Sequence, residues 1–185
     1  AFSAAQNNDK VGVIFFSDKI EKFISPKKGS THILRIIREL IDFKPENTKT
    51  DITEALRYFT NVIKKKSTAF LISDFYDNNY EDALKIASKK HDIVAIRITD
   101  EKEKTLPDLG LVKIYDPETD KTLWIDTSSK DVRNNFDAVT DFVNAAFASL
   151  LNDFRVSNVS VAPSDEVSAL FQVLFSQVGE CDVAQ

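Results

Sequence analysis

Two polar positions are the candidates for chemistry in this chain. Thr50 follows the loop 44–49 and lies directly before a stretch with helical spacing, and Asp74 follows the strand-like run Phe70-Leu71-Ile72-Ser73. A hydroxyl and a carboxylate are hard oxygen ligands, which suit Mg²⁺ because this ion prefers oxygen and keeps several waters. These residue types predict half of a divalent-cation site, and a third set of oxygens is required to complete it.

Both positions also have a structural interpretation. Asp is a favoured turn residue, so Asp74 could simply close the turn after its strand. Thr50 or Asp51 could cap the helix that follows the loop. The domain would then be purely structural at these positions, and the residue types alone leave both interpretations open.

The elements that must position these residues alternate between strand and helix. Nearly unbroken apolar runs predict strands buried on both faces, which is typical of a parallel sheet covered by helices. Strands of this kind are predicted at 11–16, 68–73 and 93–98, with a hairpin partner or edge strand at 20–24 and a short last strand at 158–162. Helices are predicted at 32–43, 52–63, 80–90, 130–154 and 164–177, and a β-hairpin near 111–126.

This alternation predicts a doubly wound α/β sheet, mostly parallel, with helices on both faces. Ligands of such sheets bind at the carboxyl ends of the strands, which directs attention to Ser17-Asp18, Ser73-Asp74 and Thr99-Asp100. Within the first helix, Ile33, Ile36, Ile37, Leu40 and Ile41 form one apolar stripe. Ser30 or Thr31 can cap that helix. His91 follows another helix and is expected at the surface or as a cap.

Composition restricts the class of protein. The chain has 185 residues, 43% of them hydrophobic and 29% charged, which is enough for one soluble domain over residues 1–185. Its net charge of −5 argues against a nucleic-acid partner. The four glycines are isolated, so no phosphate-binding loop is present. No apolar run approaches the roughly 18–20 residues of a membrane span.

The single cysteine, Cys181, fits a reducing compartment, and we expect a cytoplasmic protein. The chain contains no methionine and no signal peptide, so we expect a fragment or a processed product.

With these residues in hand, the chain resembles the bacterial domain of unknown function 58 family, within the von Willebrand factor type A (vWA) superfamily. The resemblance is carried, in family order across about residues 1–130, by Asn8-Asp9-Lys10-Val11-Gly12, Pro26-Lys27-Lys28-Gly29, Thr50-Asp51-Ile52 with Ala55-Leu56, Ile72-Ser73-Asp74-Phe75, His91-Asp92, Leu106-Pro107-Asp108-Leu109-Gly110 and Asp116-Pro117-Glu118-Thr119.

The resemblance implies a three-layer, Rossmann-like sheet with a metal-ion-dependent adhesion site at its edge. Thr50 matches the family's loop Thr, and Asp74 matches its later strand-end Asp. The family's Asp-x-Ser-x-Ser motif has no match and would lie upstream of Ala1. We therefore expect Mg²⁺ or Mn²⁺ in the complete protein and no cofactor in this chain alone.

The superfamily acts by binding and not by catalysis, since a partner carboxylate completes the coordination of the ion. The resemblance implies a protein partner, with a MoxR-type AAA+ ATPase as the candidate. The alternative is a Mg²⁺-dependent phosphatase or phosphotransferase with Asp74 and Asp100 in an acidic cluster. The absent strand would be central in the sheet, so we expect it to be replaced by an upstream segment, or by another chain through dimerisation or strand exchange.

Overall fold

The computed structural model describes residues 4, 6–47, 49–77, 79–99, 105–116, 121–154 and 156–161. The chain divides into two compact units, residues 1–64 with 77–83 and residues 65–76 with 84–185. They are called unit 1 and unit 2. The division falls within helix α4 (Glu81–Lys90).

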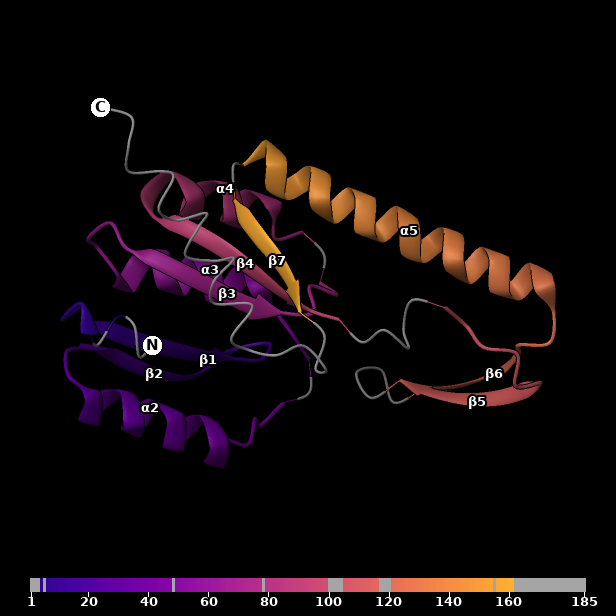
Figure 1. Ribbon diagram of the computed structural model, residues 1–185, viewed down its shortest axis with the longest axis horizontal. Helices are drawn as coiled ribbons and strands as arrows, with labels where there is room; N and C mark the ends of the chain where they lie inside the picture. The colour runs from indigo at the N-terminus through magenta and orange to yellow at the C-terminus, as the bar shows by residue number, and fades with distance from the viewer. Residues whose placement is uncertain are drawn as a thin grey trace. The chain divides into compact units, whose positions relative to one another are not determined.

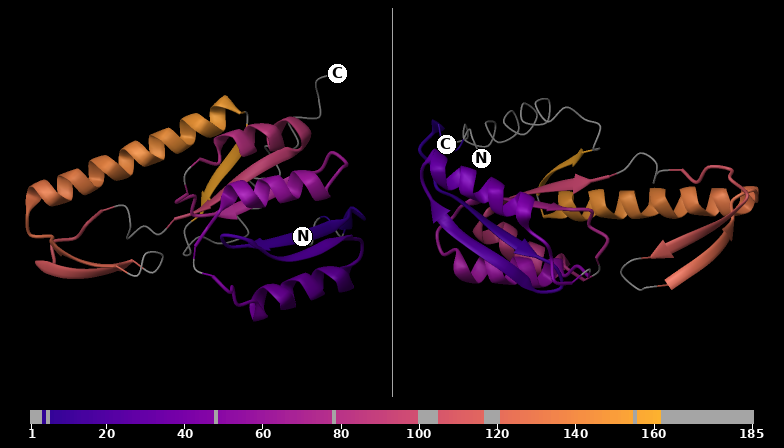
Figure 2. Two further views of the ribbon diagram at one scale, coloured as in Figure 1. Left: turned by 180° about the vertical axis from the view of Figure 1, so that it is seen from behind. Right: turned by 90° about the horizontal axis from the view of Figure 1, so that it is seen from below.

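Unit 1 is built on an antiparallel pair of strands. Strand β1 (Val11–Phe16) pairs with β2 (Ile20–Lys27), and the two lie side by side in Figures 1 and 2. Ser17, Asp18 and Lys19 connect them, so β2 is the hairpin partner that the sequence predicts. Helices α2 (Ser30–Asp42) and α3 (Ile52–Val62) follow.

The parallel pairing predicted for β1 is wrong in the part of the chain that the structure describes. Its partner there is β2 alone, antiparallel, and only Phe15 among its residues is buried. The apolar residues of β1 contribute to a small hydrophobic core, and the strand is not buried on both faces. Phe15 packs with Ile24 and Ile36 and stacks on Phe43, with ring centroids 4.7 Å apart.

Two expectations for α2 also need correction. The cap residue is Gly29, at φ 99°, and no side chain caps the helix, so neither Ser30 nor Thr31 serves that role. A positive φ suits glycine because it has no Cβ. Of the predicted apolar stripe, Ile33 and Ile36 are buried, whereas Leu40 and Ile41 at the end of the helix are exposed.

Unit 2 contains the parallel sheet. Strands β3 (Thr68–Ser73), β4 (Asp92–Ile98) and β7 (Ser157–Val161) lie in the order β3-β4-β7, as Figure 1 shows. Parallel neighbours require long connections. Here α4 lies between β3 and β4 in sequence, and α5 (Lys130–Asp153) precedes β7. The chain is therefore a mixed α/β protein, and the predicted bounds of these elements are confirmed to within one residue.

One face of β3, the face that carries Phe70 and Ile72, is exposed. Phe70 is 50% exposed and Ile72 54% exposed, so the expectation that β3 is buried on both faces is wrong for the described structure. Because side chains alternate along a strand, Leu71 points to the opposite face, where it is buried. The core of unit 2 includes Leu84 of α4 and Leu151 of α5, both fully buried.

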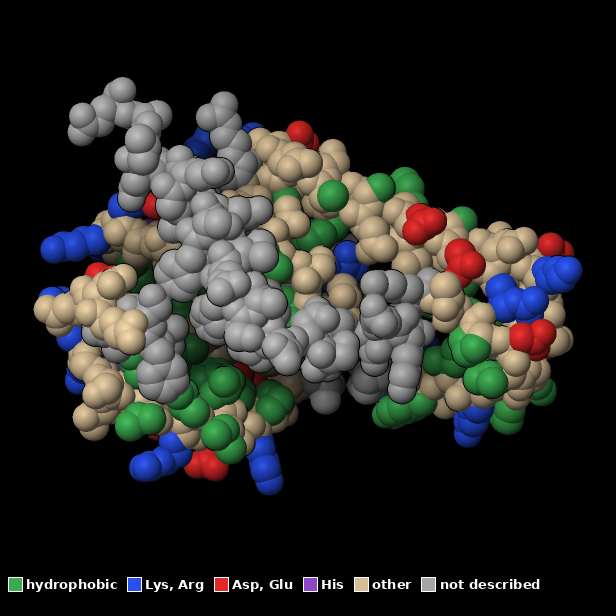
Figure 3. All heavy atoms as spheres, viewed as in Figure 1, with side chains coloured by type: hydrophobic (Ala, Val, Ile, Leu, Met, Phe, Trp, Pro, Cys, Tyr) green, Lys and Arg blue, Asp and Glu red, His purple; other side chains and the backbone are tan. Residues whose placement is uncertain are grey.

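The predicted hairpin near 111–126 is confirmed. Strand β5 (Leu111–Asp116) pairs antiparallel with β6 (Lys121–Asp126). Hydrophobic side chains gather over this hairpin in Figure 3, and the most exposed among them are Leu111, Tyr115, Leu123 and Trp124.

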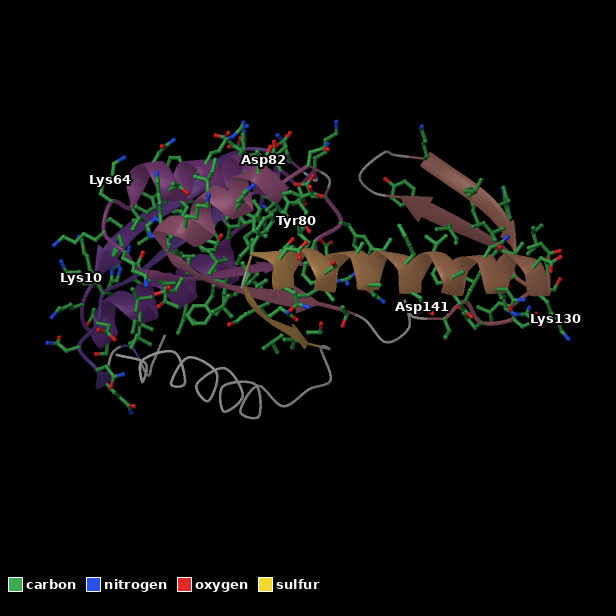
Figure 4. The ribbon with its side chains drawn as sticks, turned by 90° about the horizontal axis from the view of Figure 1, so that it is seen from above. Lys10, Lys64, Tyr80, Asp82, Lys130 and Asp141 are labelled. Atoms are coloured by element: carbon green, nitrogen blue, oxygen red, sulfur yellow. The ribbon has the colours of Figure 1, made fainter. Side chains whose placement is uncertain are left out.

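Hydrogen bonds join the hairpin to the start of α5, the end marked by Lys130 in Figure 4. Thr127 Oγ1 accepts from the amide of Leu109 at 2.9 Å, and Arg133 donates to the carbonyl oxygen of Thr127. The predicted helix 164–177 lies outside the described residues.

Candidate functional site

Thr50 lies in unit 1, in the loop that leads into α3, and is partly buried. Its neighbour Asp51 is the cap of α3, since the Asp51 carboxylate accepts a hydrogen bond from the amide of Glu54 at 2.8 Å. Of the two capping residues that the sequence allows, the structure selects Asp51. The Thr50 hydroxyl is therefore not the group that caps the helix.

The loop that carries Thr50 is fastened to the end of β1. The amide of Asp51 donates to the carbonyl oxygen of Ser17 at 2.9 Å. Asn47 Nδ2 donates to Asp18 Oδ1 at 2.7 Å, and this hydrogen bond lowers the pKa of Asp18. These bonds hold the loop at both of its ends, so the position of Thr50 is set by strand and helix together.

A second polar contact involves Glu21. The buried Ser17 hydroxyl donates to Glu21 Oε1 at 2.7 Å, which is the main reason that the pKa of Glu21 is lowered. The amide of Glu46 donates to the same oxygen at 3.1 Å. Ser17 and Glu21 thus tie the β1–β2 connection to the chain after α2.

Sequence reasoning missed Asp77, a second carboxylate at the start of α3. Asp77 Oδ2 accepts a hydrogen bond from the amide of Ile52 at 2.7 Å, while Thr53 Oγ1 donates to the carbonyl oxygen of Asn79 at 3.3 Å. A helix N-terminus favours negative charge because its first amides lack partners within the helix. The spacing Asp74-x-x-Asp77 was the available signal, but it does not reveal which helix the second carboxylate meets.

Asp74 lies in unit 2 and follows β3 directly. Its side chain is exposed, and Oδ1 accepts from the amide of Tyr76 at 3.3 Å and from the Ser73 hydroxyl at 3.3 Å. The amide of Phe75 donates to Ser73 Oγ at 3.1 Å. The carboxylate thus lies at the carboxyl end of a parallel strand, where its turn leaves it open to solvent.

The turn after Asp74 has an unusual backbone. Phe75 has a φ of 61°, which is rare for a bulky side chain and costs free energy unless the surroundings compensate. Phe75 is buried and packs on Phe147 of α5, with ring centroids 4.8 Å apart. The α5 helix therefore helps to hold the turn that presents Asp74.

Thr50 belongs to unit 1 and Asp74 to unit 2. Asp100, the other acidic strand-end candidate, lies outside the described residues. Among the residues that the structure describes, no three His, Cys, Asp or Glu side chains form a group able to hold a metal ion. Every helix formed by the same residues falls short of the length and apolar character that are needed to cross a membrane.

The sequence suggested a surface or a capping position for His91, and the surface position is wrong. His91 follows α4 as predicted, but its side chain is buried, and Nδ1 lies 3.2 Å from the Ser67 hydroxyl. Burial lowers the pKa of His91, to which the nearby charge of Lys90 adds, while Asp92 acts in the opposite direction.

The solved structures that the chain resembles support its fold. One is described as the conserved hypothetical protein BatB from Bacteroides thetaiotaomicron, with 16% identity and a TM-score of 0.54. Another is an aerotolerance-related membrane protein from Bacteroides fragilis, solved with multiple mutations to serines, with 13% identity and a TM-score of 0.59. Each match covers 94% of this chain and 80% of the other chain.

Sequence comparison gives the family. An uncharacterized protein of Mycobacterium avium, MAV169, is 29% identical over 107 residues, which are 56% of this chain and 58% of that protein. The chain thus matches little more than half the length of this curated relative. The family described as protein of unknown function DUF58 matches residues 1–145. Since this match covers most of the chain, the protein belongs to the DUF58 family.

Proposed function

We propose that this protein is a vWA-like protein-interaction module whose binding depends on a divalent cation. The proposal includes a three-layer, doubly wound Rossmann-like sheet in the complete domain. The observation that supports it most directly is the exposed carboxylate of Asp74 at the carboxyl end of β3, a parallel strand. Ligands of open α/β sheets bind at this end of the strands.

Thr50 and Asp74 are the proposed metal ligands of this chain, with Mg²⁺ or Mn²⁺ as the ion. A hydroxyl and a single carboxylate leave most of the coordination shell to other oxygens. We propose that an Asp-x-Ser-x-Ser motif upstream of Ala1 supplies part of it. A carboxylate of the partner protein supplies the last ligand, so that the ion bridges two proteins.

The proposed partner is a MoxR-type AAA+ ATPase, and the role is that of an adaptor in assembly or remodelling. This part rests on the resemblance to the family. We propose that the domain lies in the cytoplasm. Because one structural neighbour is described as a membrane protein, cell fractionation of the full-length protein is the test of location. Its recovery in the membrane fraction after a salt wash would contradict a freely cytoplasmic protein.

Calorimetric titration of Mg²⁺ and Mn²⁺ into the full-length protein tests the metal proposal. We expect binding heat from the wild type, little from Asp74→Ala, and weakened binding in Thr50→Ala. Asp141→Ala is the matched control, because Asp141 is an exposed carboxylate on α5, where Figure 4 labels it. Equal heats from the wild type and Asp74→Ala would refute the site.

A phosphatase assay on the same full-length protein separates this function from the enzymatic alternative. We expect no Mg²⁺-dependent hydrolysis of a generic phosphomonoester above the rate of the Asp74→Ala variant. Turnover that disappears in Asp74→Ala would instead favour the phosphatase.

A further inference from the structure

Arg97 is a buried cation beside the turn that presents Asp74. It is 6% exposed and lies on β4, where it is in register with Ser73, the residue before Asp74. Burying a charged group is costly unless its polar atoms find partners. The sequence indicated only an apolar strand here, so a guanidinium at this position needs an explanation.

The partners of Arg97 come from the turn and from α5. Nε donates to the carbonyl oxygen of Asp74 at 3.2 Å, and Nη1 donates to Asn144 Oδ1 at 2.7 Å. The guanidinium carbon lies 5.1 Å from the ring centroid of Phe147 and 5.7 Å from that of Tyr76. One planar cation thus contacts the backbone of the turn, the ring of Tyr76 at the end of the turn, and two side chains of α5.

These contacts restrain the backbone of the turn, whereas the side chain of Asp74 is exposed. The carbonyl of Asp74 is held by Arg97, while the carboxylate of Asp74 accepts from the amide of Tyr76. Between them, Phe75 keeps its positive φ and packs on Phe147. Without the guanidinium, the Asp74 carbonyl and the Asn144 amide oxygen would each lose a charged donor, which is a strong hydrogen-bond partner.

We propose that Arg97 is the positioning residue of Asp74: it fixes the turn 73–76 against α5 and thereby sets the direction of the Asp74 carboxylate. Arg97 acts through the backbone of Asp74 and is not itself a ligand. Its importance for metal binding rests on the proposed function, whereas its effect on the turn does not. The same contacts make Asn144 the second anchor of the arrangement.

Hydrogen exchange at the amide of Tyr76 tests the effect on the turn. In Arg97→Met, which keeps the length of the side chain but removes its donors, we expect this amide to exchange at least about tenfold faster. Arg97→Lys retains the charge without the fork of donors and should give a smaller acceleration. Asn144→Leu removes one anchor while Arg97 remains, so it provides a second variant if Arg97→Met does not fold.

Thr127→Val is the matched control, since Thr127 is buried in the same unit and forms its own hydrogen bonds, to Leu109 and Gly110. It should lower global stability without a selective change at Tyr76. Unchanged exchange at Tyr76 in both Arg97→Met and Asn144→Leu would overturn the proposal. So would an acceleration no larger than that in a Thr127→Val protein of equal global stability.

Titration of Mn²⁺ into the full-length protein then tests the consequence for binding. We expect Arg97→Met to weaken the binding of Mn²⁺ by about tenfold, and Arg97→Lys to weaken it less. A turn that is less restrained before binding must be ordered when the ion binds, and this ordering costs free energy. If the wild type binds no Mn²⁺, the proposed function fails, and the exchange at Tyr76 still decides the positioning role. If Mn²⁺ binds equally to the wild type and Arg97→Met, the link between Arg97 and the ligand is refuted.

Discussion

The amide of Ile52 donates a hydrogen bond of 2.7 Å to Oδ2 of Asp77. Two carboxylates therefore accept hydrogen bonds from the first turn of α3, since Asp51 accepts one from the amide of Glu54 at the same helix end. Ile52 is fully buried, so its amide has no water to replace a lost partner. The start of α3, and with it the loop that carries Thr50, depends on Asp77 although 25 residues separate it from Ile52.

Replacing Asp77 by Ala should lower the free energy of unfolding by about 1–3 kcal/mol, because the buried amide of Ile52 loses its acceptor. Asp77→Asn retains an acceptor oxygen and should cost less. Urea denaturation followed by circular dichroism measures both. Asp141→Ala, an exposed carboxylate on α5, should stay within about 0.5 kcal/mol of the wild type. An Asp77→Ala protein as stable as this control would contradict the capping role.

Two positions of helix α4, one buried and one exposed, test how this helix packs. Leu84 is fully buried, whereas Ile86, two residues later, is 53% exposed. Leu84→Ala should cost about 2–5 kcal/mol through the lost contacts and the cavity left behind. Ile86→Ala should cost less than about 1 kcal/mol, since Ala is also the better helix former. Equal losses in thermal unfolding would show that α4 packs through a different face.

How far the sequence predicted this fold depended on whether the signal was local. The bounds of β3, β5–β6 and α5 follow from apolar spacing and turn residues, and the structure agrees with them. The cap Asp51 could also be predicted, because its carboxylate bonds to the amide of Glu54, only three residues further along the chain. The cap Gly29 was missed because a positive φ leaves no side-chain pattern.

The features that sequence reasoning could not provide depend on contacts between distant residues. The apolar run of β1 predicted burial but not its antiparallel partner, since a hydrophobic pattern does not specify strand pairing. Arg97 and its acceptor Asn144 are 47 residues apart. Asp77 accepts a hydrogen bond from Ile52 of helix α3, which lies earlier in the sequence. Asp74 was found because its position at a strand end is a local signal. The groups that hold it were not found.

His91 should make the stability of the protein depend on pH. Burial lowers its pKa in the folded state, so between the ordinary value of about 6.5 and the lowered value the unfolded chain binds more protons. The stability that the neutral, buried His91 contributes is therefore complete above about pH 6.5. It decreases as the pH falls from this value toward the lowered pKa of the folded state. Thermal unfolding at several pH values between 7.5 and 5 should show the loss.

His91→Gln should reduce this dependence, because Gln can keep a hydrogen bond with Ser67 and does not titrate. The side chain of Lys90 and the carboxylate of Asp92 are the charges that act on His91, so the titration should also respond to salt. The same slope in wild type and His91→Gln would assign the pH dependence to other groups.

Strand β3 should pair with a further strand along its free edge. In the described part of unit 2, β3 bonds only to β4, and their register is continuous from Thr68 to Ser73. Natural edge strands are usually protected by charged residues, Pro or bulges, whereas Thr-Ala-Phe-Leu-Ile-Ser contains none of them. An unprotected edge of this kind is a template for pairing, so we expect either an upstream segment or a second copy of the chain to occupy it.

Native mass spectrometry of the 185-residue chain tests this pairing. We expect dimers or larger species, and Phe70→Lys should shift them toward monomer because it places a charge beside the edge. Leu123→Lys is the matched control, since Leu123 is a similarly exposed apolar residue on the β5–β6 hairpin. A wild-type chain that stays monomeric while the β3 amides exchange rapidly would refute the pairing. Association that responds to Leu123→Lys and not to Phe70→Lys would assign it to the hairpin, because only a contact through β3 is sensitive to a charge at residue 70.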